Sequence, residues 1–290
     1  MTIGEIHIRD PFVLVEDGKY YMYGTRGSTC WGPATGFDVY VSDNLEDWSD
    51  PVAIFENDGS FWSDLNYWAP EVHKYNGKFY LFASFKSETR CRGTQIMKAD
   101  SPLGPFVPIS DGPVTPEEWE CLDGTLYVEN EIPYIIFCHE WVQCKDGEMC
   151  ALRLTEDLTA PVGEPKLLFK ASSFSGVRSA QDDDGWFVTD GPFMYKTKNG
   201  KLVMLWSSKG EEGYCEIIGI SDNDSVFGNW NNGEYLFKKD GGHGMIFTAM
   251  DGKKYFIAHS PNKTPLERPK LFEIAEINDT LCVVGNNDEI

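Results

Sequence analysis

The chain has 290 residues, and 25 basic against 46 acidic residues give it a formal net charge of −21. A surface with this much negative charge repels nucleic acid and anionic membranes, and neither is expected as a partner. A neutral ligand such as a sugar is not excluded. Hydrophobic residues make up 41% of the chain, which is enough to bury a full core.

The first residues and the cysteines bear on the compartment. No apolar run approaches the ~20 residues that cross a bilayer, and the N-terminal residues 1–10 show neither the basic nor the apolar region of a secretory signal. A cytoplasmic location is expected, or secretion if a leader has been removed. The eight cysteines form no CxxC pair or Cys/His ligand cluster. They favour free or buried thiols over a zinc site, and a disulfide set in an exported protein is the alternative.

Five segments share one layout, in which an opening tripeptide with a small or acidic residue near Pro or Gly leads into an apolar strand, a turn and an aromatic-rich return strand. Four of the five expected turns are Asn-Gly or Asp-Gly, which favour type I′ hairpins because both central residues need positive φ. The expected turns are Asp17-Gly18, Asn76-Gly77, Asn130-Glu131, Asn199-Gly200 and Asp251-Gly252.

The spacing of these segments predicts the fold. They start near positions 10, 70, 123, 190 and 243, which leaves room for three or four short strands in each. Such a sheet cannot bury both faces alone, so it has to stack on its neighbours. Radial stacking of five sheets is a five-bladed β-propeller. We expect an all-β chain that forms one domain over residues 1–290, with almost no helix.

In a propeller the innermost strands begin at one end of the central channel, and each hairpin brings the second strand back to that end. The strand starts Asp10, Glu71, Asp123, Asp190 and His243 should therefore meet the strand ends at one mouth. Those strand ends are Thr25-Arg26, Ser84-Phe85, His139-Glu140-Trp141, Ser207-Ser208 and His259-Ser260.

Three aspartates, Asp10, Asp123 and Asp190, open inner strands at what the repeat presents as equivalent positions. Each could simply cap a turn, but a buried carboxylate is costly unless it is paired or used. A ring of acids suits either a hard cation or acid–base chemistry on a sugar. Glycoside hydrolysis needs one carboxylic acid for the leaving oxygen and one carboxylate for water or carbon. Tryptophans near the mouth, among them Trp68 and Trp141, would offer flat surfaces for sugar rings.

The ordered set of these motifs resembles glycoside hydrolase family 43, the five-bladed propeller family of arabinanases, α-L-arabinofuranosidases and β-xylosidases. The motifs are Arg9-Asp10-Pro11, Trp68-Ala69-Pro70-Glu71, Leu122-Asp123-Gly124 and Asp190-Gly191-Pro192, and the resemblance spans residues 8–277. It implies an inverting hydrolase in which Asp10 is the general base and Asp123 tunes and orients the proton donor. It also implies that no cofactor is required, and that His243 lies near the channel centre, close to a possible calcium or sodium ion.

The donor position departs from the resembled pattern. The family has Glu before Gly-Pro, whereas this chain has Asp190, one methylene shorter. Asp190 could serve as a shorter donor, Glu140 could reach in from a neighbouring strand end, or the protein could bind sugar without cutting it.

The remaining residues of the expected mouth are candidates for substrate binding: Glu71, Trp68, Trp141, His139, His243 and Arg26. The expected partner is a carbohydrate, and the sequence leaves the oligomeric state open. The function predicted is exo-acting α-L-arabinofuranosidase or β-xylosidase. The alternatives are a galactosidase or fructosidase on the same fold, a sugar-binding propeller without activity, and a protein scaffold.

Overall fold

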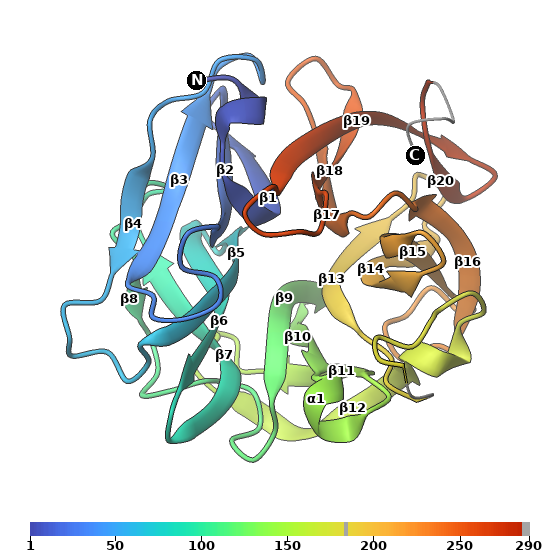
Figure 1. Ribbon diagram of the computed structural model, residues 1–290, viewed down its shortest axis with the longest axis horizontal. Coiled ribbons are helices and arrows are strands. Elements are labelled where there is room, and N and C mark those ends of the chain that lie inside the picture. The colour runs from blue at the N-terminus through green and yellow to red at the C-terminus, as the bar shows by residue number, and fades with distance from the viewer. Residues whose placement is uncertain (183–184, 286–290) are drawn as a thin grey trace.

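The computed structural model describes residues 1–182 and 185–285. Five four-stranded antiparallel sheets stand around a central axis, and each is built from four consecutive strands (Figure 1). The predicted all-β, five-bladed propeller is confirmed. Within the described residues, no helix is long and apolar enough to span a membrane.

The blades follow the chain in order, and the first strand of each is the innermost. The first two blades contain β1 (Ile8–Glu16), β2 (Lys19–Arg26), β3 (Gly36–Ser42), β4 (Val52–Glu56), β5 (Leu65–Tyr75), β6 (Lys78–Ser87), β7 (Arg90–Ala99) and β8 (Val107–Pro108). The third and fourth contain β9 (Cys121–Glu129), β10 (Ile132–His139), β11 (Glu148–Leu154), β12 (Pro161–Lys170), β13 (Asp190–Lys196), β14 (Leu202–Gly210), β15 (Gly213–Ser221) and β16 (Trp230–Phe237). The fifth contains β17 (Gly242–Thr248), β18 (Lys254–Ser260), β19 (Arg268–Ile277) and β20 (Thr280–Val283).

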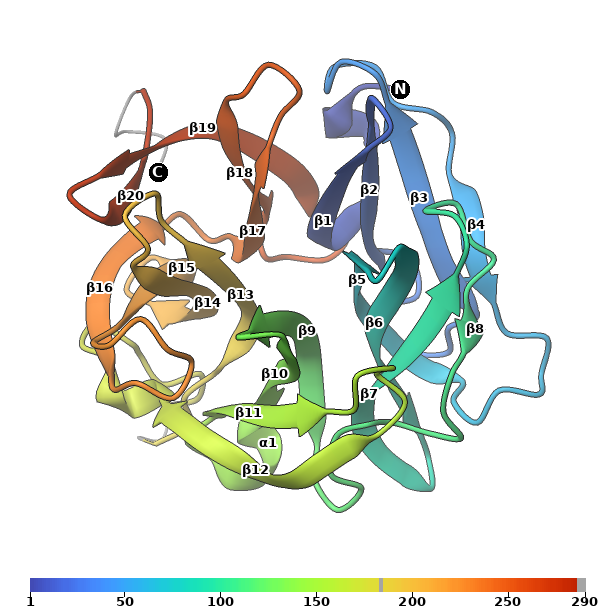
Figure 2. The same cartoon turned by 180° about the vertical axis from the view of Figure 1, so that it is seen from behind.

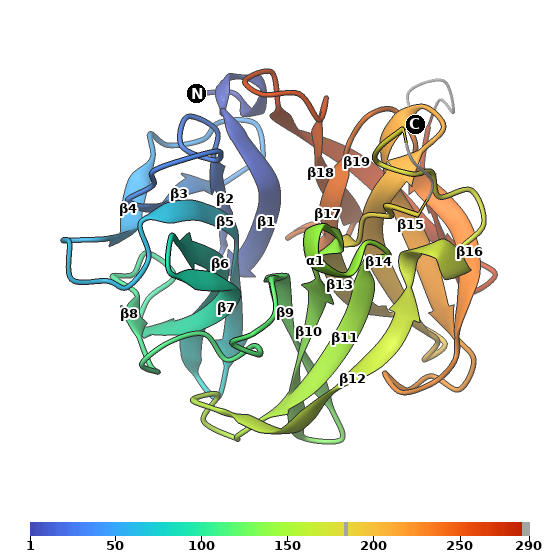
Figure 3. The same cartoon turned by 60° about the horizontal axis from the view of Figure 1, so that its bottom comes forward.

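In the described part of the chain, helical structure is confined to single turns in connecting segments: η1 (Ile3–Glu5), α1 (Trp141–Cys144) and η2 (Ala171–Ser173). Figure 3 shows α1 beside the end of β10. The ring closes where β1 lies against β17, as Figures 1 and 2 both show. Close to this seam, the Arg268 guanidinium donates to the carbonyl of Gly4 at 3.1 Å.

The inner hairpins follow the turn prediction in three blades. Both residues have positive φ at Asp17-Gly18, Asn76-Gly77 and Asn130-Glu131, as a type I′ turn requires. In the fourth and fifth blades the prediction is wrong, because only Gly200 and Gly252 have positive φ. In these two hairpins the last backbone hydrogen bonds run from Thr197 N to Lys201 O and from Ala249 N to Lys253 O. Each loop therefore holds three residues, and its glycine takes the left-handed position.

Large side chains fill the space between adjacent blades. Phe37, Tyr67 and Phe85 meet between the first and second blades with ring centroids 4.8–5.8 Å apart. Trp206 is fully buried, and its ring lies 5.3 Å from that of Phe169 between the third and fourth. All eight cysteines are unpaired and five are buried, in agreement with the favoured interpretation as free thiols.

Each innermost strand carries a β-bulge near its start, where the register with the second strand shifts. The first residue of every bulge has a left-handed backbone with φ between 47° and 56°. These five residues are Asp10, Ala69, Asp123, Gly191 and His243. The bulge bends the strand at the mouth and turns its side chain out of the regular alternation.

The backbone N–H at each bulge donates to a side chain, and four of the five acceptors lie on the second strand of the preceding blade. Because the bulged N–H is lost from the ladder, this contact satisfies a buried donor and ties each blade to the next. The pairs are Ala69 to Thr25 Oγ1 (2.7 Å), Asp123 to Ser84 Oγ (2.8 Å), His243 to Ser207 Oγ (2.7 Å) and Asp10 to His259 Nδ1 (3.2 Å). The exception is Gly191, whose N–H donates to Asp123 Oδ2 (3.0 Å).

The inter-blade contact at Ser84 predicts a measurable loss of stability. Ser84→Ala leaves the buried Asp123 N–H without its acceptor, which should lower the free energy of unfolding by about 1–3 kcal/mol. Urea unfolding followed by tryptophan fluorescence would measure the change. Ser173→Ala, which removes a hydroxyl from an exposed position, is the matched control and should stay within ~0.5 kcal/mol. Equal effects of the two substitutions would contradict the role of the bulge contact.

Candidate active site

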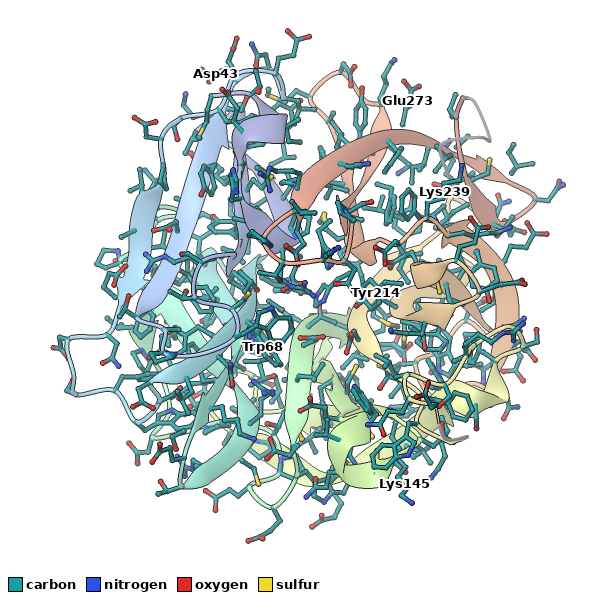
Figure 4. All side chains as sticks on the ribbon, viewed as in Figure 1. Asp43, Trp68, Lys145, Tyr214, Lys239 and Glu273 are labelled. Carbon is teal, nitrogen blue, oxygen red and sulfur yellow. The ribbon has the colours of Figure 1, made fainter. Side chains whose placement is uncertain are left out.

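A cavity of about 460 Å³ lies at the mouth of the ring, among the bulged strand starts. Figure 4 shows Trp68 and Tyr214, two of its lining residues, near the centre of the molecule. The acidic and imidazole groups that line it are Asp10, Asp123, Glu140, Asp190 and His243, and the tryptophans are Trp31, Trp68 and Trp141. The hairpin argument thus brings together four carboxyls from three blades.

The bulges aim three of these side chains. Asp10, Asp123 and His243 each occupy the left-handed bulge position, and each is less than 10% exposed. The prediction that Asp190 is equivalent to Asp10 and Asp123 is wrong, because the bulge residue of its strand is Gly191. Asp190 pairs with Ser207 as Arg9 pairs with Thr25, one position before the bulge. It therefore approaches the cavity from a different backbone direction.

Asp10 is held as a carboxylate. Thr25 Oγ1 donates to its Oδ2 at 2.6 Å, and Nδ1 of His243 lies 3.2 Å from its Oδ1. Burial acts to raise the pKa of Asp10, but His243 and the Arg9 guanidinium outweigh it and hold the pKa below the usual value. His259, fully buried, accepts the Asp10 N–H on Nδ1. Burial lowers the pKa of His259 to about 3, so this imidazole stays neutral.

The pKa values of Asp123 and Asp190 are shifted in the opposite direction to that of Asp10. Burial, followed by the nearby charge of Asp10, raises the pKa of Asp123 well above its usual value. Burial and the charge of Asp123 raise the pKa of Asp190 to about 7, although Tyr214 donates to Asp190 Oδ2 at 2.9 Å. Like charges packed this closely cannot all ionise together. The cluster therefore combines an acid whose pKa is lowered, Asp10, with two acids whose pKa values are raised, Asp123 and Asp190.

Glu140 lies in the same cavity but is already paired. Arg92 Nε donates to Glu140 Oε2 at 3.2 Å, and both side chains are less than 10% exposed. The Arg92 guanidinium also stacks 3.5 Å from the centroid of the Trp68 ring. Arg92 thus joins the carboxyl group of Glu140 to the ring of Trp68 at one side of the cavity.

Three predicted contacts do not line this cavity. Glu71 is buried two positions beyond the bulge residue Ala69 and lies 2.9 Å from His73 Nε2. His139 stacks on Trp119 at 4.3 Å, and its Nδ1 lies 2.9 Å from Glu148 Oε2. Arg26 forms ion pairs with Asp38 of β3 and Glu56 of β4. For Glu71 the reason is the bulge, which shifts the register between Trp68 and Glu71.

The two acidic partners of Arg26, Asp38 and Glu56, balance its charge away from the cavity lining. We therefore assign no substrate contact to Glu71, His139 or Arg26.

The sequence argument missed several lining residues, among them Arg9, Tyr214, Asn262 and Thr264. Arg9 contacts Glu267 and donates to Asn262 Oδ1 at 2.8 Å, and Trp31 Nε1 donates to Thr264 Oγ1 at 2.8 Å. These pairs join residues more than 230 positions apart. Arg9 precedes a motif aspartate and could have been noticed, but the others come from a third strand or from connecting loops without a repeat signal.

An ion is expected near His243, but among the described residues no group of three potential protein ligands converges there. Over residues 1–182 and 185–285, the sole group of three converging potential ligands is His139, Cys144 and Glu148. The ammonium of Lys170 already lies 2.9 Å from Glu148, and burial raises the pKa of the Cys144 thiol to about 11, which disfavours the thiolate that binds metals. We assign neither place to a metal and route no chemical step through one.

One buried acid lies behind the cavity. Glu216 on β15 is fully buried, and its Oε2 accepts from Ser207 Oγ at 2.7 Å and from Gly244 N at 3.1 Å. Its Oε1 has no hydrogen-bond partner. Burial raises the pKa of Glu216 to about 8, so it carries a proton at neutral pH.

A five-bladed propeller with clustered carboxyls in its mouth is the architecture of a class of glycosidases, and the comparisons with known proteins agree. The profile of glycosyl hydrolases family 43 matches residues 2–279. The chain belongs to glycosyl hydrolase family 43 and is a glycosidase.

Among solved structures, the fold is similar to an endo-arabinase from Bacteroides thetaiotaomicron, with a TM-score of 0.89, 37% identity and coverage of 96% of this chain and 98% of that one. Among curated proteins, the extracellular exo-α-(1→5)-L-arabinofuranosidase ArbA of Cellvibrio japonicus is 24% identical over 88% of this chain and 79% of its own length. The extracellular endo-α-(1→5)-L-arabinanase 1 of Bacillus subtilis is 33% identical over 30% of this chain and 28% of its own.

The protonation of Glu216 predicts a pH dependence of stability. Because its folded pKa of about 8 exceeds the ordinary 4.5, the folded state binds more protons than the unfolded state between these values, and stability falls as pH rises through them. Glu216→Gln removes this loss. The difference in unfolding free energy, variant minus wild type, should increase by on the order of 1 kcal/mol or more from pH 5 to pH 8. Urea unfolding at both pH values measures it, and a constant difference would contradict the buried, protonated state.

Proposed function

We propose that the protein removes single α-L-arabinofuranosyl residues from arabinan-type chains by an inverting displacement. One observation carries the proposal: a single cavity holds an acid with a lowered pKa, Asp10, and an acid with a pKa raised to about 7, Asp190. A base and an acid whose environments push their pKa values apart are what glycoside hydrolysis needs.

Asp10 acts as the general base. Its carboxylate takes a proton from a water molecule that attacks the anomeric carbon from one face of the sugar ring. Thr25 fixes Oδ2 through a 2.6 Å hydrogen bond. The other oxygen, Oδ1, faces the His243 imidazole, which helps to keep the group ionised before the reaction.

Asp190 acts as the general acid. It gives its proton to the glycosidic oxygen as the bond to the anomeric carbon breaks, and no covalent sugar–enzyme bond forms. Asp123 serves it in two ways. Its charge helps to raise the pKa of Asp190, and its Oδ2 holds the N–H of Gly191, the residue directly after the donor. This contact compensates for the shorter aspartate by fixing the backbone from which it extends.

Glu140 is assigned to binding rather than proton donation. Its carboxyl group is already engaged by the Arg92 guanidinium, and it can still accept hydrogen bonds from sugar hydroxyls. Trp68, which carries the same guanidinium on one face, offers an apolar surface on the cavity side for a sugar ring.

The substrate assignment is supported by the names of the relatives, because arabinose is common to the three described above. The exo mode is supported by the name of the Cellvibrio japonicus relative, which aligns with 88% of this chain. The names of the Bacteroides thetaiotaomicron structure and the Bacillus subtilis relative describe endo-acting enzymes, so the mode is decided by the products.

Product analysis tests the substrate and the mode together. With linear (1→5)-α-L-arabinan, arabinose should be the first product by anion-exchange chromatography, and proton NMR should show the β anomer before mutarotation. Oligosaccharides as first products would overturn the exo mode. Faster hydrolysis of nitrophenyl β-xyloside than of nitrophenyl α-L-arabinofuranoside would overturn the sugar, and binding of arabinan without any release would overturn hydrolysis itself.

Variants of the three acids separate their roles. Asp10→Asn should lower kcat by about 10²–10⁴-fold on every substrate, because the base is lost. Asp190→Asn should lower kcat strongly on arabinobiose but much less on nitrophenyl arabinofuranoside, whose leaving group needs no proton. Glu140→Gln should mainly raise KM on both.

The pH dependence checks the donor assignment. Wild-type kcat/KM should fall above pH ~7 as Asp190, with its pKa of about 7, loses its proton. If Glu140→Gln, and not Asp190→Asn, loses activity on arabinobiose while keeping it on nitrophenyl arabinofuranoside, the proton donor is Glu140.

A further inference from the structure

Glu216 is a buried acid that the proposed reaction does not use, and it contacts the bulge that carries His243. We propose that Glu216, together with Ser207, is a positioning residue that holds the His243 imidazole against the Asp10 carboxylate. The inference rests on the proposed role of Asp10 as base, and the experiment below separates the two.

The contacts form a short chain from β15 to the cavity. Glu216 Oε2 accepts from Ser207 Oγ at 2.7 Å, and Ser207 Oγ accepts from the backbone N–H of His243 at 2.7 Å. The same Oε2 accepts from the N–H of Gly244 at 3.1 Å. One carboxyl oxygen thus fixes, directly or through one hydroxyl, both backbone donors of this bulge.

The blade before the Asp123 bulge shows the same arrangement with different chemistry. Ser84 accepts the Asp123 N–H at 2.8 Å, and Thr94 Oγ1 accepts the Gly124 N–H at 3.2 Å. Thr94 pairs with Ser84 across the strands as Glu216 pairs with Ser207. A hydroxyl therefore suffices to support such a bulge, and a carboxyl at Glu216 is larger than the structural task demands.

His243 has a particular need for this support. It is a non-glycine residue with φ of 52°, a strained conformation that persists only where the surroundings impose it. Its Nδ1 lies 3.2 Å from Asp10 Oδ1 and 3.6 Å from Asp123 Oδ2. A small relaxation of the bulge would move the imidazole away from both carboxyl groups. A displacement of about 1 Å at a catalytic group can lower the rate about 10²-fold.

Loss of this contact has a directional consequence for the base. His243 is the largest of the influences that lower the pKa of Asp10 against burial, so its displacement should raise the pKa of Asp10. The charged and titratable groups that face this pair from other strands are Arg9, Asp123, Asp190, Tyr214, Glu216 and His259. None of the five besides Glu216 is altered in the variants below.

The test compares Glu216→Leu with Glu216→Gln. Leucine removes both hydrogen bonds yet fills a similar volume, and replacing a buried acid by an apolar residue is often tolerated. We expect kcat to fall at least about tenfold with KM changed less than about threefold, and the acidic limb of the kcat/KM profile to move to higher pH. Glutamine keeps an acceptor oxygen and should restore kcat to within about threefold of the wild type.

Ser221→Ala is the matched control, because Ser221 is a fully buried polar residue of the same strand whose hydroxyl donates to Ser225 O at 2.7 Å in an outer turn. It should leave kcat and the pH profile unchanged. If Glu216→Leu fails to fold, Ser207→Ala breaks the same chain at its other link and should produce the same shift of the acidic limb. Wild-type kcat and pH profile in both Glu216→Leu and Ser207→Ala would overturn the inference.

A second readout does not depend on turnover. The chain has five histidines, so the imidazole signals can be followed by NMR and His243 assigned with His243→Gln. The ring signals of His243 at a fixed pH should shift in Glu216→Leu or Ser207→Ala, because the imidazole leaves its place 3.2 Å from Asp10 Oδ1, and should match the wild type in Glu216→Gln. Unchanged ring signals in all three variants overturn the inference even if the wild type hydrolyses arabinan. Shifted ring signals in Glu216→Leu or Ser207→Ala support it even if the wild type proves inactive and the proposed function fails.

Discussion

The hydrogen bond between a bulged N–H and a neighbouring side chain is the constraint on which the mouth of this propeller depends. A left-handed residue near the start of each inner strand removes one N–H from its ladder, and four of the five blades supply an acceptor to the next from their second strand. In the remaining blade the equivalent residue is Cys138, and the acceptor is the carboxylate of Asp123. The one departure from the structural pattern thus couples two of the catalytic candidates.

Burial disfavours the charged form of all three aspartates, and their different neighbours then shift their pKa values in opposite directions. Asp10 receives the imidazole of His243 and a hydroxyl, so its pKa falls, whereas Asp123 and Asp190 face it and each other, so their pKa values rise. No single residue type could specify this division, because all three are aspartates. The difference comes from the direction in which each backbone presents its side chain and from the partners on neighbouring blades.

Much of the architecture could be predicted because it is local and repeated. Asp-Gly and Asn-Gly turns between apolar strands mark the hairpins, and their spacing gives five blades. The convergence of Asp10, Asp123, Asp190 and Glu140 follows from hairpin alternation alone. Two of the errors share a cause: a bulge adds a residue to one strand and changes the face on which the later residues of that strand lie. It separates Asp190 from the bulge position and shifts Glu71 relative to its expected place. The three-residue turns at Gly200 and Gly252 have a different origin, because those hairpins close with three loop residues in place of two.

The amino-acid order by itself determined the number of blades, their sequence around the axis and the set of acids available at one mouth, since each of these depends on contacts within about sixty residues. The tertiary structure decided which acid is ionised, that Arg92 pairs with Glu140 and stacks on Trp68, and that Tyr214 and Glu216 serve the site from third strands. These depend on contacts between blades, as for Arg92 with Glu140, or between strands that are not neighbours in one blade, as for Tyr214 with Asp190. Hydrogen bonds and charges act over a few ångströms, and no short-range pattern records which distant side chains the closed ring brings within that distance.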